Sequence, residues 1–334
     1  MFELTLASAP GYLARRGLAP AGEAIEVTEL PGGVSATVIS ARVPSTGSAV
    51  VIKQALPQLR VRDEWLATPD RAETEVAAMG LCGAITPGVV PRIVDSDPAA
   101  HVLVMELVPA EARNWQAEVA EGRVHAGTGR WAGATLGAWH AATASGDSAS
   151  GDSASAEMAA SLDDHEAFEQ LRLRPFYETV IERRPELASG ITPLLEELRR
   201  ERRCLVHGDY SLKNMLVGPV GNWVLDFEVA HYGNPVFDLG FFLSFVVLSG
   251  IRWAPLRLEL RTLAEGFLTG YEDTAGGGFA GDVASITQHT AALMLARTDG
   301  KSPAQFLDAP SRARAREIGI VLLRQPEQGL WQWL

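Results

Sequence analysis

The sequence predicts an α+β fold of two lobes, with a small mixed β-sheet lobe over residues 1–107 and a larger, mainly helical lobe over residues 108–334. Two observations support this division. Short β-rich runs separated by glycine and proline turns gather before residue 107, with one helical pattern among them. Beyond residue 113, apolar residues recur mostly at helical spacing. A chain of 334 residues with 47% hydrophobic residues is long and apolar enough to bury a sizeable core.

Three short strands are expected at the start of the small lobe, at 24–30, 34–43 and 49–52, with Lys53 ending the third. Gly32 and Gly33 lie in the turn between the first two strands, just before Ser35. Because glycine has no Cβ, the backbone amides of such a turn can approach phosphate groups closely. We therefore interpret Gly32, Gly33, Ser35 and Lys53 as candidate nucleotide-binding residues, although a Gly-Gly turn is most often only a turn.

A helix is expected over 70–81, with Asp70 as its N-cap. Either Glu73 or Glu75 of this helix could hold Lys53, and we favour Glu75. Strands at 89–94 and 101–107 complete the small lobe. Glu106 and Val108 follow as a hinge whose backbone groups could contact an adenine.

The rest of the chain is predicted to be mostly helical, with one strand pair at 215–217 and 223–225. Helices are expected at about 131–142, 163–184, 187–203, 236–250, 255–270, 280–297 and 309–325. A tandem Ser-Gly-Asp-Ser-Ala repeat over Ser145–Ala154 carries no large apolar side chain, and we expect a mobile surface loop there.

The residues that indicate a chemistry lie in His207-Gly208-Asp209, followed by Asn214 and then Asp226. The pattern H-x-D-x-x-x-x-N has the spacing of kinase catalytic loops. An aspartate at the Asp209 position can accept a proton from an attacking hydroxyl. Asn214 and Asp226 would both reach the same phosphates and supply the oxygen ligands that Mg²⁺ prefers. A purely structural loop is the alternative, and the presence of Asp226 and an upstream lysine strand disfavours it.

These residues resemble the aminoglycoside phosphotransferase and choline kinase family, which has a protein-kinase-like fold. The resemblance covers nearly the whole chain and is strongest over His207–Asn214 and Asp226–Gly240. It implies that Asp209 is the catalytic base and that Asn214 and Asp226 bind magnesium. It also implies that Asp238 supports the catalytic loop from a buried helix. We interpret His207 as a further supporting residue, and Glu228 as a residue that supports the metal site, accepts from substrate or makes only a structural hydrogen bond.

A narrower resemblance, over the stretch from Lys53 to Glu75, is to methylthioribose kinase, which phosphorylates a thiosugar. The sequence departs from that enzyme in having Phe227 between Asp226 and Glu228, where it has proline, and Asn214 where it has serine. The C-terminal arginine pair of that enzyme is reduced here to Arg316. These differences leave the expected nucleotide chemistry unchanged, but they leave the identity of the acceptor undecided.

Charge and cysteine content limit the partners and the compartment. The formal net charge of −12 disfavours binding to nucleic acid or to an anionic membrane surface. Two cysteines exclude a disulfide scaffold, and no signal peptide or membrane-spanning run is read. A cytoplasmic protein is therefore expected, and the sequence gives no indication of its oligomeric state.

The function expected is transfer of the γ-phosphoryl group of ATP, with Mg²⁺, to a hydroxyl of a small molecule such as a sugar, thiosugar or amino-sugar. Two alternatives stay open, a choline or amino-alcohol kinase and a nucleotide-binding pseudokinase without turnover. A protein kinase is disfavoured, because no Ala-Pro-Glu motif follows Asp226.

Overall fold

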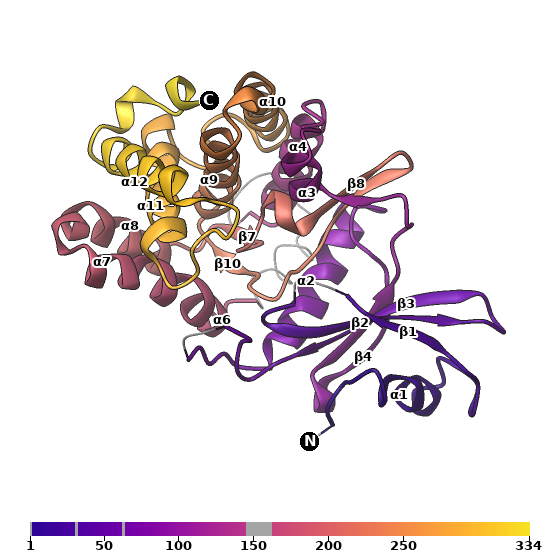
Figure 1. Cartoon of the computed structure of the whole chain (residues 1–334). Coiled ribbons are helices and arrows are strands. Elements are labelled where there is room, and N and C mark those ends of the chain that lie inside the picture. The colour runs from indigo at the N-terminus through magenta and orange to yellow at the C-terminus, as the bar shows by residue number, and fades with distance from the viewer. Residues whose placement is uncertain (1, 31–32, 62–63, 145–161) are drawn as a thin grey trace.

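The computed structural model describes residues 2–30, 33–61, 64–144 and 162–334. A β-sheet lobe formed by the first third of the chain packs beside a larger lobe of helices formed by the rest (Figure 1). The expected α+β fold of two lobes is confirmed. The tandem repeat over Ser145–Ala154 lies outside the described residues.

The small lobe contains one antiparallel sheet in the order β1-β2-β3-β5-β4. Helix α1 precedes this sheet, and helix α2 lies between its third and fourth strands in the chain. Its elements are α1 (Ala9–Arg15), β1 (Glu26–Glu29), β2 (Ala36–Val43), β3 (Ser48–Ala55), α2 (Arg71–Ile85), β4 (Ile93–Asp97) and β5 (Val102–Glu106).

The large lobe is mainly helical and holds two small antiparallel sheets, β10-β7 and β6-β8-β9. Its strands are β6 (Arg113–Asn114), β7 (Cys204–Val206), β8 (Met215–Gly218), β9 (Gly221–Val224) and β10 (His231–Gly233). Its main helices are α3 (Trp115–Ala120), α4 (Thr128–Ala142), α6 (Glu166–Phe168), η2 (Glu169–Glu178), α7 (Thr179–Arg183), α8 (Ala188–Arg200), α9 (Val236–Arg252), α10 (Arg257–Ala275), α11 (Val283–Asp299) and α12 (Ala309–Arg324).

One local expectation is wrong. The strand expected at 89–94 begins only at Ile93, because Pro91 lacks the N–H that a central strand must donate. Asp70 occupies the N-cap position of α2 as expected, although its side chain makes no capping hydrogen bond. The structure also contains β7 and β10, which are three residues each and too short to leave a pattern in the sequence.

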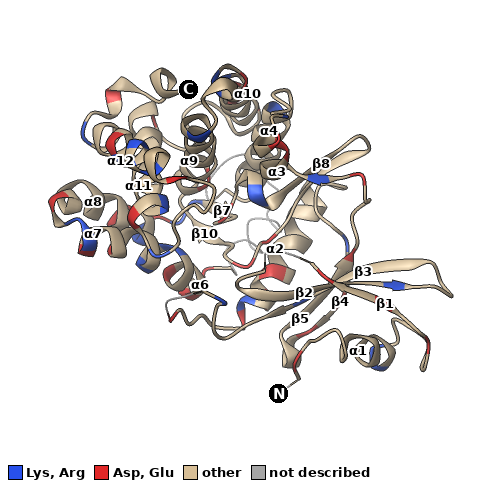
Figure 2. Cartoon of the chain, in the orientation of Figure 1, with Lys and Arg blue, Asp and Glu red and all other residues tan. Residues whose placement is uncertain are grey.

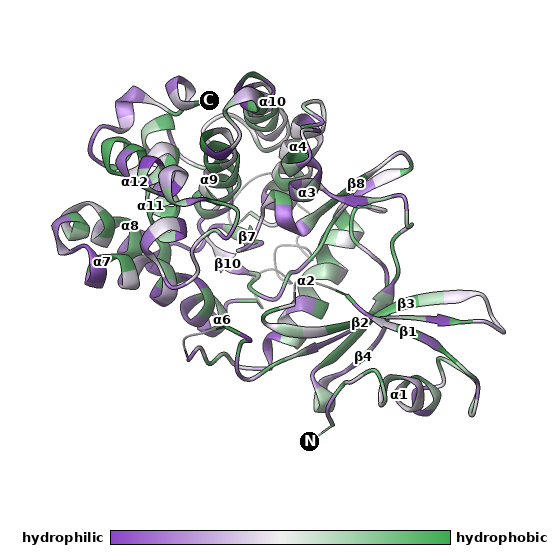
Figure 3. Cartoon of the chain, viewed as in Figure 1, coloured by the Kyte–Doolittle hydropathy of each residue, from purple (hydrophilic) through white to green (hydrophobic). Residues whose placement is uncertain are grey.

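Helix α9 forms the centre of the large lobe, and residues 236–250 are all buried. Its ribbon is strongly hydrophobic along most of its length (Figure 3). Helices α4 and α10 pack unusually closely nearby. A Cβ placed on Gly133 of α4 would lie only 1.8 Å from the carbonyl oxygen of Phe267 in α10. Glycine is therefore required at this contact, because any side chain would push α4 and α10 apart.

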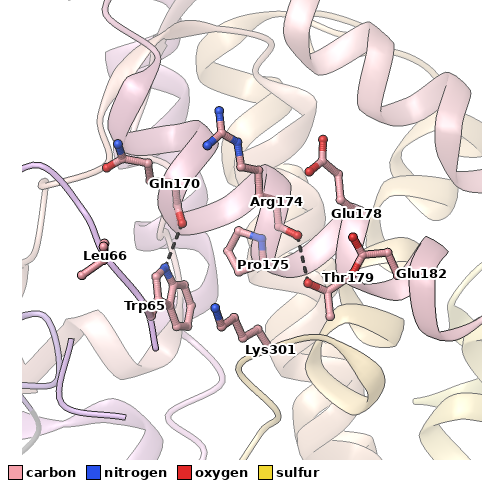
Figure 4. A pocket seen from close by; sticks show the side chains of 9 residues that line it. All are labelled: Trp65, Leu66, Gln170, Arg174, Pro175, Glu178, Thr179, Glu182 and Lys301. Carbon is pink, nitrogen blue, oxygen red and sulfur yellow. Dashed lines mark hydrogen bonds between the residues drawn. The ribbon is translucent and has the colours of Figure 1, made fainter. Parts of the chain in front are cut away.

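The segment before α2 joins the two lobes by contacts with η2. The indole N–H of Trp65 donates to the carbonyl of Gln170 (Figure 4). The backbone N–H of Thr68 donates to the Gln170 side chain. The ammonium of Lys301, which follows α11, donates to the carbonyl of Glu64. Among the described residues, no helix is long and apolar enough to cross a membrane.

Candidate active site

Lys53 lies at the interface of the two lobes. Strand β3 carries it, α2 presents Glu75 to it, and the segment after β9 brings Asp226. The Lys53 Nζ atom is 2.8 Å from Glu75 Oε1 and 2.5 Å from Asp226 Oδ1. Of the two glutamates considered from the sequence, Glu75 is thus the one that the structure places against this lysine. Burial favours a raised pKa for Asp226, but the Lys53 ammonium outweighs it and the pKa is lowered.

The catalytic-loop segment is held by the carboxylate of Asp238, which is fully buried in α9. This carboxylate accepts the backbone N–H groups of His207, at 2.7 Å, and Gly208, at 2.9 Å. Burial by itself would raise the pKa of Asp238, but hydrogen bonding and charge from His140 lower it. Asp238 therefore stays ionised and fixes the backbone that leads into Asp209.

Gly208 adopts a left-handed conformation, with φ of +77°. A Cβ on this residue would lie 2.5 Å from the carbonyl oxygen of Val229. Both the backbone angle and the close approach require glycine here. The sharp turn directs the next residue, Asp209, away from β7.

The imidazole of His207 connects the catalytic loop to the strand that leads to Asp226. Its Nδ1 accepts the backbone N–H of Asp209 at 3.1 Å, which leaves Nε2 as the protonated nitrogen. That Nε2 donates to the carbonyl of Leu225 at 3.2 Å. Burial lowers the pKa of His207 and keeps the ring neutral, as this pair of hydrogen bonds requires.

The carboxylate of Asp209 is 2% exposed and is surrounded by nitrogen atoms. Its Oδ1 lies 3.0 Å from Nη2 of Arg172, and its Oδ2 lies 2.7 Å from Lys213 Nζ and 2.7 Å from Asn214 Nδ2. Burial would raise its pKa, but Arg172 and Lys213 outweigh this effect and lower it. The group is therefore an ionised acceptor of hydrogen bonds.

A cluster of carboxylates next to Asp209 has the chemistry of a divalent cation site. Oxygen atoms of Glu75, Asp226 and Glu228 lie within 4.8 Å of one another. The Asn214 side-chain nitrogen is directed to Asp209, which leaves its Oδ1 as the atom available to a cation. This all-oxygen donor set suits Mg²⁺ or Ca²⁺ better than a transition metal.

The remaining predicted residues belong to the β-sheet lobe or to the chain that leaves it. Gly33 and Ser35 lead into β2, and the Ser35 carbonyl accepts from the Arg71 guanidinium at 2.6 Å. Glu106 ends β5, and Val108 follows it where the chain leaves the sheet. Gly32 lies outside the described residues.

Sequence reasoning missed three arginines. Arg71, 1% exposed, donates to Glu228 at 3.1 Å and so ties α2 to the cation cluster. Arg172 contacts Asp209, and Arg297 lies nearby on α11 and is partly buried. Arg172 lies between Leu171 and Leu173 in a stretch that also carries Glu169 and Arg174, so no signal in the sequence distinguished it. By contrast, Arg316 forms a two-pronged ion pair with Asp299.

Two cavities are lined by none of the predicted site residues. One, of about 220 Å³, is bordered by Trp65, Arg174 and Lys301 on the outer side of η2 (Figure 4). The other, of about 200 Å³, lies between α2 and the turn from β4 to β5.

Lysine and arginine positions are interspersed with acidic ones over both lobes (Figure 2).

The site combines a lysine–glutamate pair in the β-sheet lobe, an ionised aspartate on a loop and carboxylates that could hold a cation. This arrangement is typical of kinases. The chain matches the model of the phosphotransferase enzyme family over residues 26–277, and it belongs to that family. The expectation of a phosphotransferase is confirmed.

The sequence identity between this chain and individual relatives is low. The chain is 26% identical to methylthioribose kinase of Bacillus velezensis over 274 residues, which cover 75% of this chain and 67% of that enzyme. The fold resembles a choline/ethanolamine kinase family protein from Mesorhizobium loti, with a TM-score of 0.57, 17% identity and 98% of each chain covered. It also resembles an aminoglycoside phosphotransferase from Alicyclobacillus acidocaldarius, with a TM-score of 0.52, 14% identity, and 100% of this chain and 96% of that one covered.

Proposed function

We propose that the protein transfers the γ-phosphoryl group of ATP to a hydroxyl group of a small, sugar-like molecule, with Mg²⁺ as the metal. The observation that carries this proposal is the position of Asp209. Its ionised carboxylate lies on a loop beside the carboxylate cluster, and the Asn214 amide nitrogen donates to it at 2.7 Å. The overall reaction forms one phosphate ester bond, breaks the β–γ anhydride of ATP and releases ADP and a proton.

Asp209 is the group that accepts a hydrogen bond from the acceptor hydroxyl and then takes its proton. A positioned carboxylate of this kind contributes a factor of about 10²–10⁴ to the rate. The lowered pKa of Asp209 keeps it available as an acceptor at neutral pH. Most of the remaining contribution of the chain is positioning, because phosphoryl transfer needs little covalent chemistry from the protein.

Lys53 and the glycine turn hold the nucleotide phosphates, while Glu106 and Val108 hold the base through their backbone. Glu75 keeps the ammonium of Lys53 in place at 2.8 Å. Asp226 and Asn214 would hold Mg²⁺, and Glu228 is a second carboxylate close to Asp226. When bound, the metal neutralises the charge of the phosphate oxygens.

A sugar-like acceptor is supported by the similarity to methylthioribose kinase, which extends over three quarters of this chain. Release of ADP would test the function, measured in a coupled assay with thiosugars, hexoses, sugar acids, hexosamines, aminoglycosides and choline as acceptors. Acceptor-dependent ADP release that is lost in Asp209→Asn supports the proposal. Tight ATP binding without acceptor-dependent release would favour the pseudokinase alternative.

A further inference from the structure

Arg172 places a positive charge on the acceptor side of Asp209. It comes from η2, is 7% exposed, and its Nε donates to the carbonyl of Gly208 at 2.8 Å. Its Nη2 lies 3.0 Å from Asp209 Oδ1. An acceptor hydroxyl within hydrogen-bond reach of Asp209, about 2.6–3.2 Å, therefore also lies beside this guanidinium.

Arg297 of α11 is a second arginine in the same place. Its guanidinium carbon lies 5.9 Å from the centroid of the Phe176 ring, and that of Arg172 lies 5.5 Å from the same centroid. Arg297 also stacks on Phe245 at 5.3 Å. The aromatic rings hold the two side chains near each other and near Asp209.

Within the described parts of the chain, the guanidinium of Arg297 forms no ion pair. Its single hydrogen bond to these residues runs from Nη1 to the Ser302 hydroxyl at 3.1 Å, and its buried Nε has no partner among them. Burial and the repulsion of Arg172 lower the pKa of Arg297 to about 10, against the attraction of Asp209. An arginine has five N–H donors, and the described residues accept from one of those on Arg297.

A partly buried cation without an ion-pair partner is costly, and the unmade hydrogen bond of its buried Nε adds to that cost. Part of Arg297 remains exposed to solvent, so a solute can reach it. An anionic group of a bound molecule would relieve both costs. A cationic acceptor, in contrast, would be repelled by Arg172 and Arg297 together.

The nucleotide is a different anion, and the proposed function assigns it to other groups. Lys213 and Asn214 contact Oδ2 of Asp209, and Lys53 contacts Asp226. Arg172 contacts the other oxygen, Oδ1, from the helical side. The two arginines are therefore placed for the acceptor.

We infer that the acceptor carries an anionic oxygen group, a carboxylate or a phosphate, in addition to the hydroxyl that receives the phosphoryl group. Arg297 binds this group, and Arg172 lies between it and Asp209. The inference rests on the proposed function and narrows its substrate class to hydroxy acids, sugar acids or sugar phosphates. Aminoglycosides and choline are excluded as preferred acceptors.

Matched acceptor pairs test this inference in the full-length chain. D-Glycerate is compared with glycerol, D-gluconate with D-sorbitol, and D-glucose 6-phosphate with D-glucose, at equal ionic strength. At least one anion should exceed its neutral partner in kcat/KM by roughly 10- to 100-fold, the range set by charged hydrogen bonds. The first two pairs report a carboxylate and the third reports a phosphate.

Arg297→Met should remove that preference mainly through KM, and Arg297→Lys should restore part of it. The matched control is Arg261→Met, which removes an exposed arginine paired with Glu265 on α10. The control should keep the full preference. Equal use of charged and neutral partners by the wild type, or the same preference in Arg297→Met, would overturn the inference.

A binding measurement separates this inference from the proposed function. Thermal melting is recorded with Mg²⁺ and a non-hydrolysable ATP analogue, with each anion or its neutral partner added. An anion should raise the melting temperature of the wild type more than that of Arg297→Met. Such a shift without any ADP release would keep the inference and reject the kinase function, whereas release with neutral or cationic acceptors alone would do the reverse.

Discussion

The ammonium of Lys53 lies 2.5 Å from the carboxylate of Asp226, a residue 173 positions further along the chain. The same ammonium contacts Glu75 at 2.8 Å. The Lys53 ammonium thus links strand β3 to helix α2 and to the segment that carries Asp226. These contacts connect the two lobes at the point where the nucleotide phosphates would lie.

Replacement of Lys53 by methionine should lower the free energy of unfolding by about 3–5 kcal/mol, because it leaves Glu75 buried without its counter-ion. The double variant Lys53→Met/Glu75→Gln should recover part of that loss. Urea unfolding of the wild type, the two single variants Lys53→Met and Glu75→Gln, and the double variant measures both effects. Strictly additive losses would show that the two side chains do not interact energetically.

Asp209→Asn should reduce turnover by about 10²–10⁴-fold, because an amide cannot take the proton of the acceptor hydroxyl. Nucleotide affinity should change little, since Lys53 and the cation cluster are untouched. Steady-state ADP release and calorimetric titration with ATP measure the two quantities. Near-normal turnover in the variant would remove Asp209 from the mechanism.

Most of the fold follows from patterns that are local in the sequence. The period of apolar residues locates α4, α9 and α12 to within a few residues, because each helix buries a long stripe or its whole surface. Strands β7 and β10 are different, since three residues contain no period. Their pairing is set by the packing of α9 and the catalytic loop, and no local signal encodes it.

The same distinction applies to the site. Asp209, Asn214 and Asp226 are found from spacing, because one loop and one hairpin bring them together. Arg172 and Arg297 come from two separate helices, and no spacing relates them. Their meeting at Asp209 depends on how η2 and α11 pack through Phe176, which only the tertiary structure shows.

Asp226→Ala should abolish the dependence of nucleotide affinity on magnesium, since a carboxylate ligand is lost. Asn214→Ala should weaken this dependence less, because a neutral amide is the poorer ligand for a hard cation. Calorimetric titration of ATP with and without Mg²⁺ compares the variants. If wild-type affinity is the same with and without the metal, the cation assignment fails.

His231 should make the protein less stable in acid. Its ring is 1% exposed, is stacked on Phe168 at 3.9 Å, and is directed through Nδ1 to the carbonyl of Val229. Burial, with repulsion from His165, lowers the pKa of His231 to about 3. Above its ordinary pKa of 6.5 the ring is neutral in both folded and unfolded chains, so its contribution to stability is complete there.

As the pH falls below that value, the unfolded chain binds a proton at His231 and the folded chain does not. The free energy of unfolding should therefore fall by about 1.4 kcal/mol per pH unit on account of this residue. In His231→Phe that contribution is absent, so the pH slope between about pH 6 and pH 4 should be shallower by the same amount. Urea unfolding at a series of pH values measures both slopes. Parallel slopes for the wild type and the variant would mean that His231 takes up its proton equally well in the folded protein.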